Sequence, residues 1–204
     1  MGILDESWRR CFDDLGAALP ARQVFDQLLA RYDEPHRAYH THQHLEECFG
    51  WMTQARDLMR RPGEVAFALF YHDAIYDTHA PDNEAQSAEL AAAVWEAHAG
   101  GSAAAVRDLI AATKHDAAAP DGDAQVLVDI DLSILGAAPA RFDEYERQVR
   151  FEYSWVAEDA FRAGRGRILK QFADQPRLYN TAFFRARLEA AARENLARSL
   201  SLLA

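Results

Sequence analysis

Apolar residues recur every three to four positions along most of this chain, and that period is typical of amphipathic α-helices. Leu4, Trp8 and Phe12 follow it in the first segment, and a longer helix is expected at about 41–60. Pro62 then stands where the first turn of a new helix tolerates a proline. With 204 residues, 50% of them hydrophobic, the chain is long enough to bury a core. We therefore expect a single all-α domain of about eight to ten helices over residues 1–204.

The densest apolar run of the chain, at 124–135, allows two interpretations. It is rich in β-branched residues at its start, so a short buried strand is one alternative. We favour a buried helix, because Gly136 and Pro139 mark the end of one helix and the start of the next. Residues 116–123 include Pro120 and Gly122 and are expected to form a surface loop. Further helices are expected at about 83–100, 139–161, 164–172 and 179–203.

The charge of the chain excludes one class of function. With 32 acidic and 22 basic residues the net charge is −10, so general binding to nucleic acid through a positive field is not expected. Residues 162–198 depart from this with nine basic and three acidic side chains, and a solvated helical face is the simplest interpretation. No apolar run suits a membrane span, and the first residues lack a secretory pattern. Two cysteines, Cys11 and Cys48, build no disulfide framework, which favours the cytoplasm.

Histidines and aspartates in apolar surroundings are the residues most suggestive of chemistry. Three histidines spaced four residues apart would share one face of a continuous helix, namely His36, His40 and His44. The dipeptide His72-Asp73 closes an apolar helix, while Asp129 and Asp131 lie within an apolar run. Ionised carboxylates in such places are costly unless they are paired or bound to a metal. Imidazole and carboxylate ligands together suit manganese, iron, cobalt, nickel, zinc or magnesium.

Five short motifs that contain these residues follow one another along the chain. They are RAYHTHQHL at 37–45, FYHDAIYD at 70–77, NEAQSA at 83–88, DIDLSILG at 129–136 and RFEY at 150–153. Their order is similar to that of the HD superfamily of metal-dependent phosphohydrolases, and locally they resemble its compact bacterial group of predicted metal-dependent HD phosphohydrolases. The resemblance covers about residues 32–195. It implies an HD-type helical domain with its core in that range.

The resemblance also implies a divalent metal held by one histidine, a His-Asp pair and a distal aspartate. Carried over residue by residue, the metal ligands are His44, His72, Asp73 and Asp131. His40 is the alternative to His44, and Asp129 is the alternative to Asp131. Two residues apart on a helix, the two aspartates cannot both face the metal. The ion would be manganese, magnesium, iron, cobalt, nickel or zinc, and a second ion is allowed.

A metal in such a site would activate a water molecule for attack on a phosphate ester. Asp77 and Glu84 are the catalytic candidates that would orient this water or protonate the leaving oxygen. Their structural alternatives are a turn residue and a carboxylate in the first turn of a helix. Four residues are expected to bind the phosphate of a nucleotide or another small phosphorylated substrate, namely Arg37, His40, His115 and Arg150. The basic run offers Arg165 and Arg167 as well.

Two other functions stay open on the sequence alone. Some members of the same superfamily use a di-iron site for oxidative cleavage, and His40 and His115 would supply the extra ligands. A non-catalytic nucleotide-sensing or interaction module would keep the fold and bind without turnover. A homodimer is allowed. The four tryptophans fall on helical apolar stripes and are expected in the core, namely Trp8, Trp51, Trp95 and Trp155.

Overall fold

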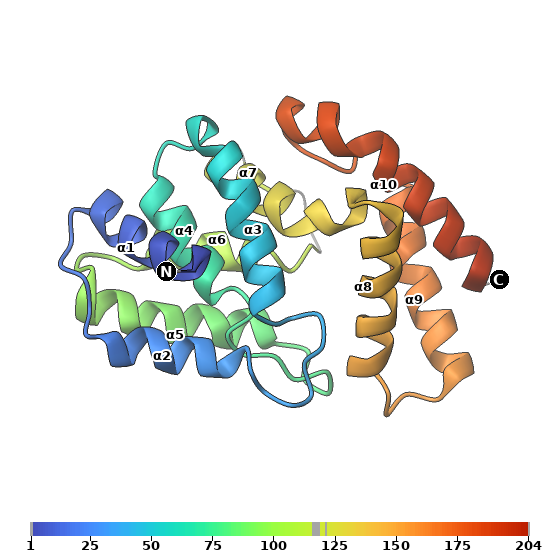
Figure 1. The fold of residues 1–204 in the computed structure, drawn as a ribbon, viewed down its shortest axis with the longest axis horizontal. Helices are drawn as coiled ribbons and strands as arrows, with labels where there is room; N and C mark the ends of the chain where they lie inside the picture. Colours follow the sequence, from blue (N-terminus) through green and yellow to red (C-terminus); the bar gives the residue numbers. More distant parts are fainter. Residues whose placement is uncertain (1, 116–118, 121, 204) are drawn as a thin grey trace.

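The computed structural model describes residues 2–115, 119–120 and 122–203, and those residues form helices and connections without a strand (Figure 1). The expectation of an all-α fold is confirmed, and the described chain has ten α-helices and two short 3-10 helices. Among them, no helix is long and apolar enough to cross a membrane. In chain order the elements are α1 (Ile3–Leu15), α2 (Arg22–Arg31), α3 (His42–Gln54), η1 (Arg56–Leu58), α4 (Pro62–Tyr71), α5 (Asn83–His98), α6 (Ala104–Ala112), α7 (Asp123–Asp131), η2 (Leu132–Gly136), α8 (Pro139–Glu152), α9 (Glu158–Ala173) and α10 (Ala182–Leu203).

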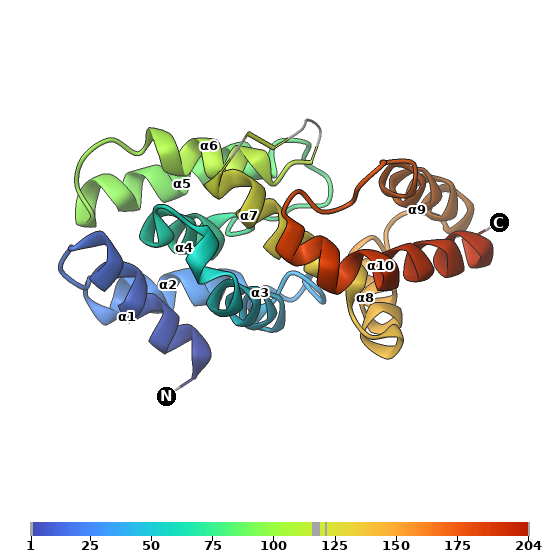
Figure 2. The same ribbon diagram turned by 90° about the horizontal axis from the view of Figure 1, so that it is seen from above.

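The helices form two groups in space (Figures 1 and 2). Helices α1–α7 make up the first group, and helices α8–α10, which follow η2 in the chain, make up the second. Helix α4 lies at the centre of the first group and packs against α1, α3, α5, α6 and α7. All of its residues except Pro62 and Glu64 are buried, which agrees with a sequence that is apolar on every side. The end of this buried helix is therefore enclosed by other helices, and that is where the His72-Asp73 pair lies.

Aromatic rings fill the core between α1, α2 and α4. Trp8 packs against four phenylalanines, with ring centroids 4.9 Å from Phe12, 5.0 Å from Phe25, 6.3 Å from Phe67 and 5.1 Å from Phe70. The edge-to-face and stacked arrangements are those that aromatic quadrupoles favour. This cluster holds α1 and α2 against α4 and so positions the end of α4.

The apolar run after residue 123 is a helix, as favoured from the sequence. Helix α7 packs against α3, α4 and α6, and η2 continues the chain to α8 and α10. The contact of η2 with α10 is close, since a Cβ at Gly136 would lie 2.6 Å from the Cβ of Leu188. The side chain of Asn195 on α10 donates to the carbonyls of Leu135 and Ala137, both at 2.9 Å. Helix α7 and η2 thereby join the two groups of helices.

The prediction of one helix over 139–161 is wrong. Helix α8 ends at Glu152, and α9 begins at Glu158. The Arg150 guanidinium donates to the carbonyls of Tyr153 and Val156 at 2.7 and 3.0 Å, which stabilises the turn between the two helices. Helix α9 accordingly begins well before the expected position at 164.

The first histidines also depart from the expectation. Helix α3 begins at His42, so His36 and His40 precede it and do not share a helical face with His44. His36 instead bonds through Nε2 to the carbonyl of Tyr76 at 2.7 Å. The helix expected to reach residue 60 ends at Gln54 and is followed by η1. The predicted loop at 116–123 lies partly outside the described residues. Its last residue, Asp123, is the first residue of α7.

The basic run in the second group of helices is largely paired within the molecule. Arg165 is buried and reaches Glu146 at 2.5 Å, and Arg193 reaches Glu189 at 2.7 Å. Arg167 is exposed. Part of the basic run thus consists of arginines that pair with glutamates within the molecule.

Candidate metal centre

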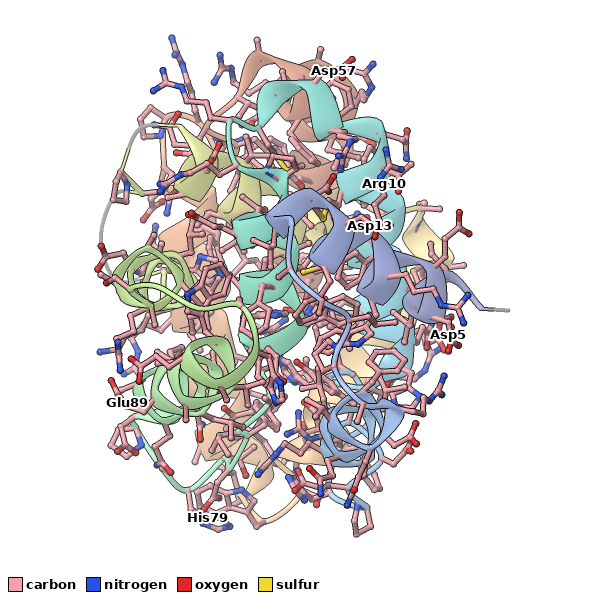
Figure 3. The ribbon with its side chains drawn as sticks, turned by 90° about the vertical axis from the view of Figure 1, so that its left-hand side faces the viewer. Asp5, Arg10, Asp13, Asp57, His79 and Glu89 are labelled. Carbon is pink, nitrogen blue, oxygen red and sulfur yellow. The ribbon has the colours of Figure 1, made fainter. Side chains whose placement is uncertain are left out.

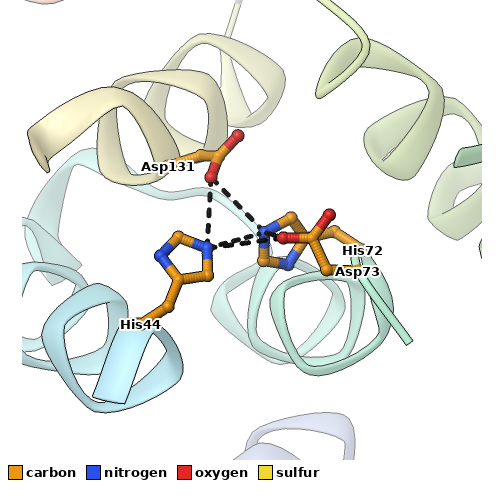
Figure 4. A group of neighbouring side chains, drawn as sticks. All are labelled: His44, His72, Asp73 and Asp131. Carbon is orange, nitrogen blue, oxygen red and sulfur yellow. Dashed lines mark hydrogen bonds and ion pairs between the residues drawn. The ribbon is translucent and has the colours of Figure 1, made fainter. Parts of the chain in front are cut away.

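Three helices bring two histidines and two aspartates to one point inside the fold (Figure 4). His44 lies in the first turn of α3, His72 and Asp73 follow the last residue of α4, and Asp131 ends α7. One ligand atom from each side chain lies within 4.8 Å of all the others. The two histidines are buried, and the two carboxyl groups are nearly so. The structure thus brings together the four residues that the sequence motifs predict as metal ligands.

The distances between these atoms fit a single metal ion. Nε2 of His44 and Nε2 of His72 are 3.1 Å apart. Nε2 of His72 is 2.9 Å from Asp73 Oδ2 and 3.4 Å from Asp131 Oδ1, and Nε2 of His44 is 3.5 and 3.4 Å from the same two oxygens. Ligands about 2.1 Å from one ion are about 3.0 Å apart in octahedral and about 3.4 Å apart in tetrahedral coordination. The four atoms could therefore hold a divalent cation, and the nitrogen and oxygen set is compatible with several.

The hydrogen bonds of His72 prepare it as a ligand. Its Nδ1 lies 2.8 Å from the carbonyl of Leu69, so Nδ1 carries the proton that it donates there. Once Nε2 has lost its proton, the ring presents the lone pair of Nε2 toward the other ligand atoms. A histidine whose second nitrogen is fixed by a carbonyl is the usual arrangement of a metal-binding imidazole.

Opposite charges stabilise one another in this group. Burial alone would lower the pKa of His72, but Asp73 and Asp131 raise that pKa well above its ordinary value. Burial alone would raise the pKa of Asp131, but hydrogen bonds from His115, His44 and His72 hold it well below its ordinary value. The histidines therefore hold protons among the carboxylates in the absence of a cation. A metal ion would displace those protons, so its affinity rises with pH.

Asp131 and Asp129 point to different parts of the molecule, as expected for two residues separated by two positions on a helix. The Asp129 carboxylate accepts hydrogen bonds from the backbone N–H groups of Asn180 and Thr181 at 2.7 and 2.8 Å. It also accepts one from the Asn180 side chain at 3.0 Å. Asp129 thus secures the start of α10. Between the two alternatives left by the sequence, Asp131 is the one in the metal group.

His115 lies against the group and contacts the second oxygen of Asp131. Its Nε2 is 2.8 Å from Asp131 Oδ2, while Oδ1 of that carboxylate faces His44 and His72. The backbone of His115 has a φ of 57°, in the left-handed region that few non-glycine residues adopt. His115 was expected to bind phosphate. The structure assigns it a contact that orients Asp131, and phosphate binding by its ring stays a prediction.

His40 adjoins the group from the other side and is held by Glu152. Nδ1 of His40 is 2.8 Å from Glu152 Oε2, and the Tyr76 hydroxyl donates to the same oxygen at 2.9 Å. The ring centroids of His40 and Tyr76 are 4.1 Å apart. No described residue forms a hydrogen bond with Nε2 of His40. His40 is thus outside the four-residue group and beside it, since its ring centroid lies 5.9 Å from that of His44.

The sequence analysis missed the roles of Glu152 and Tyr76. Oε1 of Glu152 accepts three backbone N–H groups, from Ala38 at 2.8 Å, Tyr39 at 2.7 Å and His40 at 3.0 Å. Burial alone would raise the pKa of Glu152, but His40 and these N–H groups lower it to about 2. Glu152 stands in the RFEY motif, whose arginine was the expected functional residue. The local sequence carries no clear signal, because the end of α8 also contains Arg147, Gln148 and Arg150.

Arg37 supports the metal ligands through the backbone. Its guanidinium donates to the carbonyl of His40 at 3.2 Å, of Asp73 at 2.7 Å and of Ala74 at 3.3 Å, and to Glu34 Oε2 at 2.9 Å. The side chain is buried. Its donors are thus committed to holding the end of α4 beside the segment that precedes α3. Four of its five N–H donors have partners within the protein, and phosphate binding by Arg37 stays a prediction.

Arg150 is likewise committed within the protein. Besides the two carbonyls of the turn before α9, it pairs with Glu158 at 3.0 Å and lies 4.5 Å from the ring centroid of Phe161. This arrangement gives Arg150 a role in joining α8 to α9. Phosphate binding by Arg150 stays a prediction.

Neither predicted catalytic carboxylate belongs to the four-residue group. Asp77 is exposed, and its Oδ1 accepts the N–H of His79 at 2.8 Å, as in an Asx turn. The side chain of Asn83 bonds the backbone of Asp77 from the start of α5. Glu84 is half-buried in the first turn of α5, where the helix dipole favours a carboxylate. These placements match the structural alternatives, and a catalytic role for either residue stays a prediction.

The comparisons with known proteins add no relative to this description. The chain matches no protein-family model, no curated protein and no solved structure. What can be concluded about its chemistry therefore rests on the four converging ligands and the residues that hold them.

Proposed function

We propose that this protein is a metal-dependent phosphohydrolase that cleaves a phosphate ester of a nucleotide or another small phosphorylated metabolite. One observation carries the proposal. Two imidazole nitrogens and two carboxylate oxygens converge at spacings that fit one divalent cation. The resemblance of the five motifs to the HD phosphohydrolases supports the same function.

A divalent cation held by these residues would lower the pKa of a water molecule and offset the negative charge that develops on a phosphoryl group. The protein's own residues would prepare this chemistry. His115 holds one oxygen of Asp131 so that the other faces the histidines. Leu69 fixes the tautomer of His72, and Arg37 holds the backbone of Asp73. The ligands are thereby oriented before any substrate arrives.

His40 is the residue best placed to move a proton. Glu152 holds its Nδ1, as the acidic partner of a catalytic histidine holds the ring in one tautomer. Its Nε2 has no hydrogen bond with any described residue. His40 would then protonate the leaving oxygen or orient the attacking water, a role that the sequence motifs had suggested for Asp77 or Glu84.

Phosphate release by the purified protein tests the proposal. Protein stripped with a chelator and then loaded with manganese, magnesium, cobalt, nickel, zinc or ferrous iron is assayed against phosphomonoesters, nucleotides and cyclic dinucleotides. We expect metal-dependent release of phosphate or pyrophosphate, lost in His72→Ala and Asp73→Asn. His98→Ala is the matched control, because His98 is exposed at the end of α5.

Failure would have a clear form. A protein that binds a divalent ion at this site and leaves the whole panel unchanged with every metal would contradict the proposal. Two irons per chain with oxygen-dependent turnover would favour the oxygenase alternative instead.

A further inference from the structure

A cavity of about 640 Å³ has Tyr76 and Trp155 among its lining residues. Its walls come from the chain that connects α4 to α5, from the end of α2 and the residues after it, and from the end of α8 with the turn that follows. This volume is that of a typical small-molecule site. The metal group contributes none of the lining, so the cavity is distinct from that group.

An exposed tryptophan forms part of the lining and is fixed in orientation. Trp155 was expected in the core, and that prediction is wrong, because 53% of the residue is exposed. Its indole N–H donates to Thr78 Oγ1 at 2.8 Å, and its ring stacks on His79 with centroids 4.0 Å apart and planes at 24°. Figure 3 shows His79 at the outer surface of the molecule. The indole is thus held by two polar residues without being covered.

Trp155 is accompanied by a second large apolar side chain with no cover. Phe151 is 55% exposed and lines the same cavity. Trp8 and Trp95, in contrast, are 3% and 6% exposed. Two exposed aromatic side chains in one concave site form a surface on which a planar ring can stack.

The charges around the cavity favour a neutral ligand part. Three carboxylates line it, those of Glu34, Asp77 and Glu152, against the single guanidinium of Arg31. Glu34 lies 3.7 Å from Nε2 of His36. A multiply charged phosphate would meet mostly like charge here. A planar ring with donor and acceptor groups at its edge would find partners for both.

We propose that this cavity binds a nucleobase-type ring, planar, uncharged and heteroaromatic, stacked against Trp155. The site adjoins the metal centre because Tyr76 lines the cavity and also packs on His40 and bonds Glu152. The inference goes beyond hydrolysis, since it concerns a ring and not the phosphate. It therefore stands or fails independently of the proposed function.

Calorimetric titration of nucleosides into the full-length chain tests this inference. Adenosine, guanosine, cytidine and uridine carry no phosphate, and prior removal of metal by a chelator excludes a contribution from the metal centre. We expect binding, tighter for the purines because their rings stack more strongly. Trp155→Ala should weaken it about tenfold or more, since stacking of one base on an aromatic side chain has about this effect. Trp155→Phe, which keeps a ring, should stay within about threefold of the original protein.

Two further variants keep the result interpretable. Ile168→Ala is the matched control, because Ile168 is 44% exposed on α9 and does not line the cavity. His79→Ala leaves the indole intact and removes its stacking partner, so it should weaken binding even if Trp155→Ala fails to fold. Absence of nucleoside binding at millimolar concentration, or equal affinity in all variants, would overturn the inference. Binding without hydrolysis of any phosphate ester would leave it standing and reject the proposed function.

Discussion

Asp129 and Asp131 are the same type of residue, two positions apart on α7, yet they meet opposite surroundings. Three N–H donors surround the carboxylate of Asp129 at 2.7 to 3.0 Å, and all come from the start of the chain segment that leads into α10. The carboxylate of Asp131 meets the imidazoles of His44, His72 and His115 instead. Two residues along a helix turn the side chain by about 200°, which is why one helix serves both places.

The difference teaches how to separate a structural carboxylate from a ligand. Backbone N–H groups are fixed in the chain. A carboxylate whose hydrogen bonds all come from them therefore connects two segments of the fold. Imidazole nitrogens exchange a proton for a metal, so a carboxylate that faces them can exchange its partners too. Glu152 combines both features, because one of its oxygens accepts backbone N–H groups and the other faces His40.

The largest effect is expected from removing a ligand oxygen. Asp131→Asn should weaken the binding of Mn²⁺ or Zn²⁺ by about 1,000-fold, or about 4 kcal/mol, because the affinity depends on an anionic ligand. Asp129→Asn, the matched variant on the same helix, should change it by less than about threefold. Isothermal titration calorimetry at constant pH measures both. Equal losses of metal affinity in the two variants would remove the distinction between the two aspartates.

The free energy of unfolding should depend on Asp129, the aspartate that metal binding does not need. Asp129→Ala leaves the N–H groups of Asn180 and Thr181 without their partner, and we expect it to lower the free energy of unfolding by about 3–4 kcal/mol. Asp143→Ala removes an exposed carboxylate that pairs with Arg198 and should cost less than about 1 kcal/mol. Urea titrations of the metal-free proteins give both values. A loss below 1 kcal/mol in Asp129→Ala would show that its hydrogen bonds do not hold α10.

The mixed surroundings of Glu152 predict a pH dependence. Its folded pKa of about 2 lies below the ordinary value of 4.5, so its contribution to stability is present above the ordinary value and is lost as the pH falls toward 2. That contribution is roughly 3 kcal/mol. The difference in unfolding free energy between the original protein and Glu152→Gln should therefore shrink by this amount from pH 6 to pH 2. A difference that stays constant with pH would contradict the lowered pKa.

The smallest effect is expected at the residue that only orients a ligand. His115→Ala should weaken metal binding about 10- to 30-fold, because Asp131 Oδ1 is then held less firmly. His98→Ala is the control and should leave the affinity unchanged. Competition titration with a chelating dye resolves factors of this size. A loss as large as that in Asp131→Asn would make His115 a direct ligand.

Much of the fold could be predicted because its helices show a clear apolar period. The interpretation of residues 124–135 as helix was correct, since Gly136 and Pro139 punctuate it. The break between Glu152 and Glu158 was missed, because it depends on contacts of the Arg150 side chain with backbone carbonyls. No local pattern reveals such contacts.

The candidate site could be predicted in part from the five motifs and their resemblance to a known family. The motifs place His44, His72, Asp73 and Asp131 in the group that the structure brings together. Arg37 and Arg150 were expected at phosphate, which stays a prediction, and both side chains form hydrogen bonds to other parts of the protein. A motif cannot show which partner an arginine meets. Glu152 is 112 residues from His40 in the chain, so only the folded structure reveals their contact.

Anomalous diffraction from crystals of the protein grown with Mn²⁺ tests the metal centre most directly. We predict one strong anomalous peak about 2.0–2.3 Å from Nε2 of His44, Nε2 of His72 and one oxygen each of Asp73 and Asp131. Asp129 should keep its hydrogen bonds to Asn180 and Thr181 in the same crystal. A protein with no peak among these four side chains, or with the ion bound at another place, would contradict the assignment of this group as a metal centre.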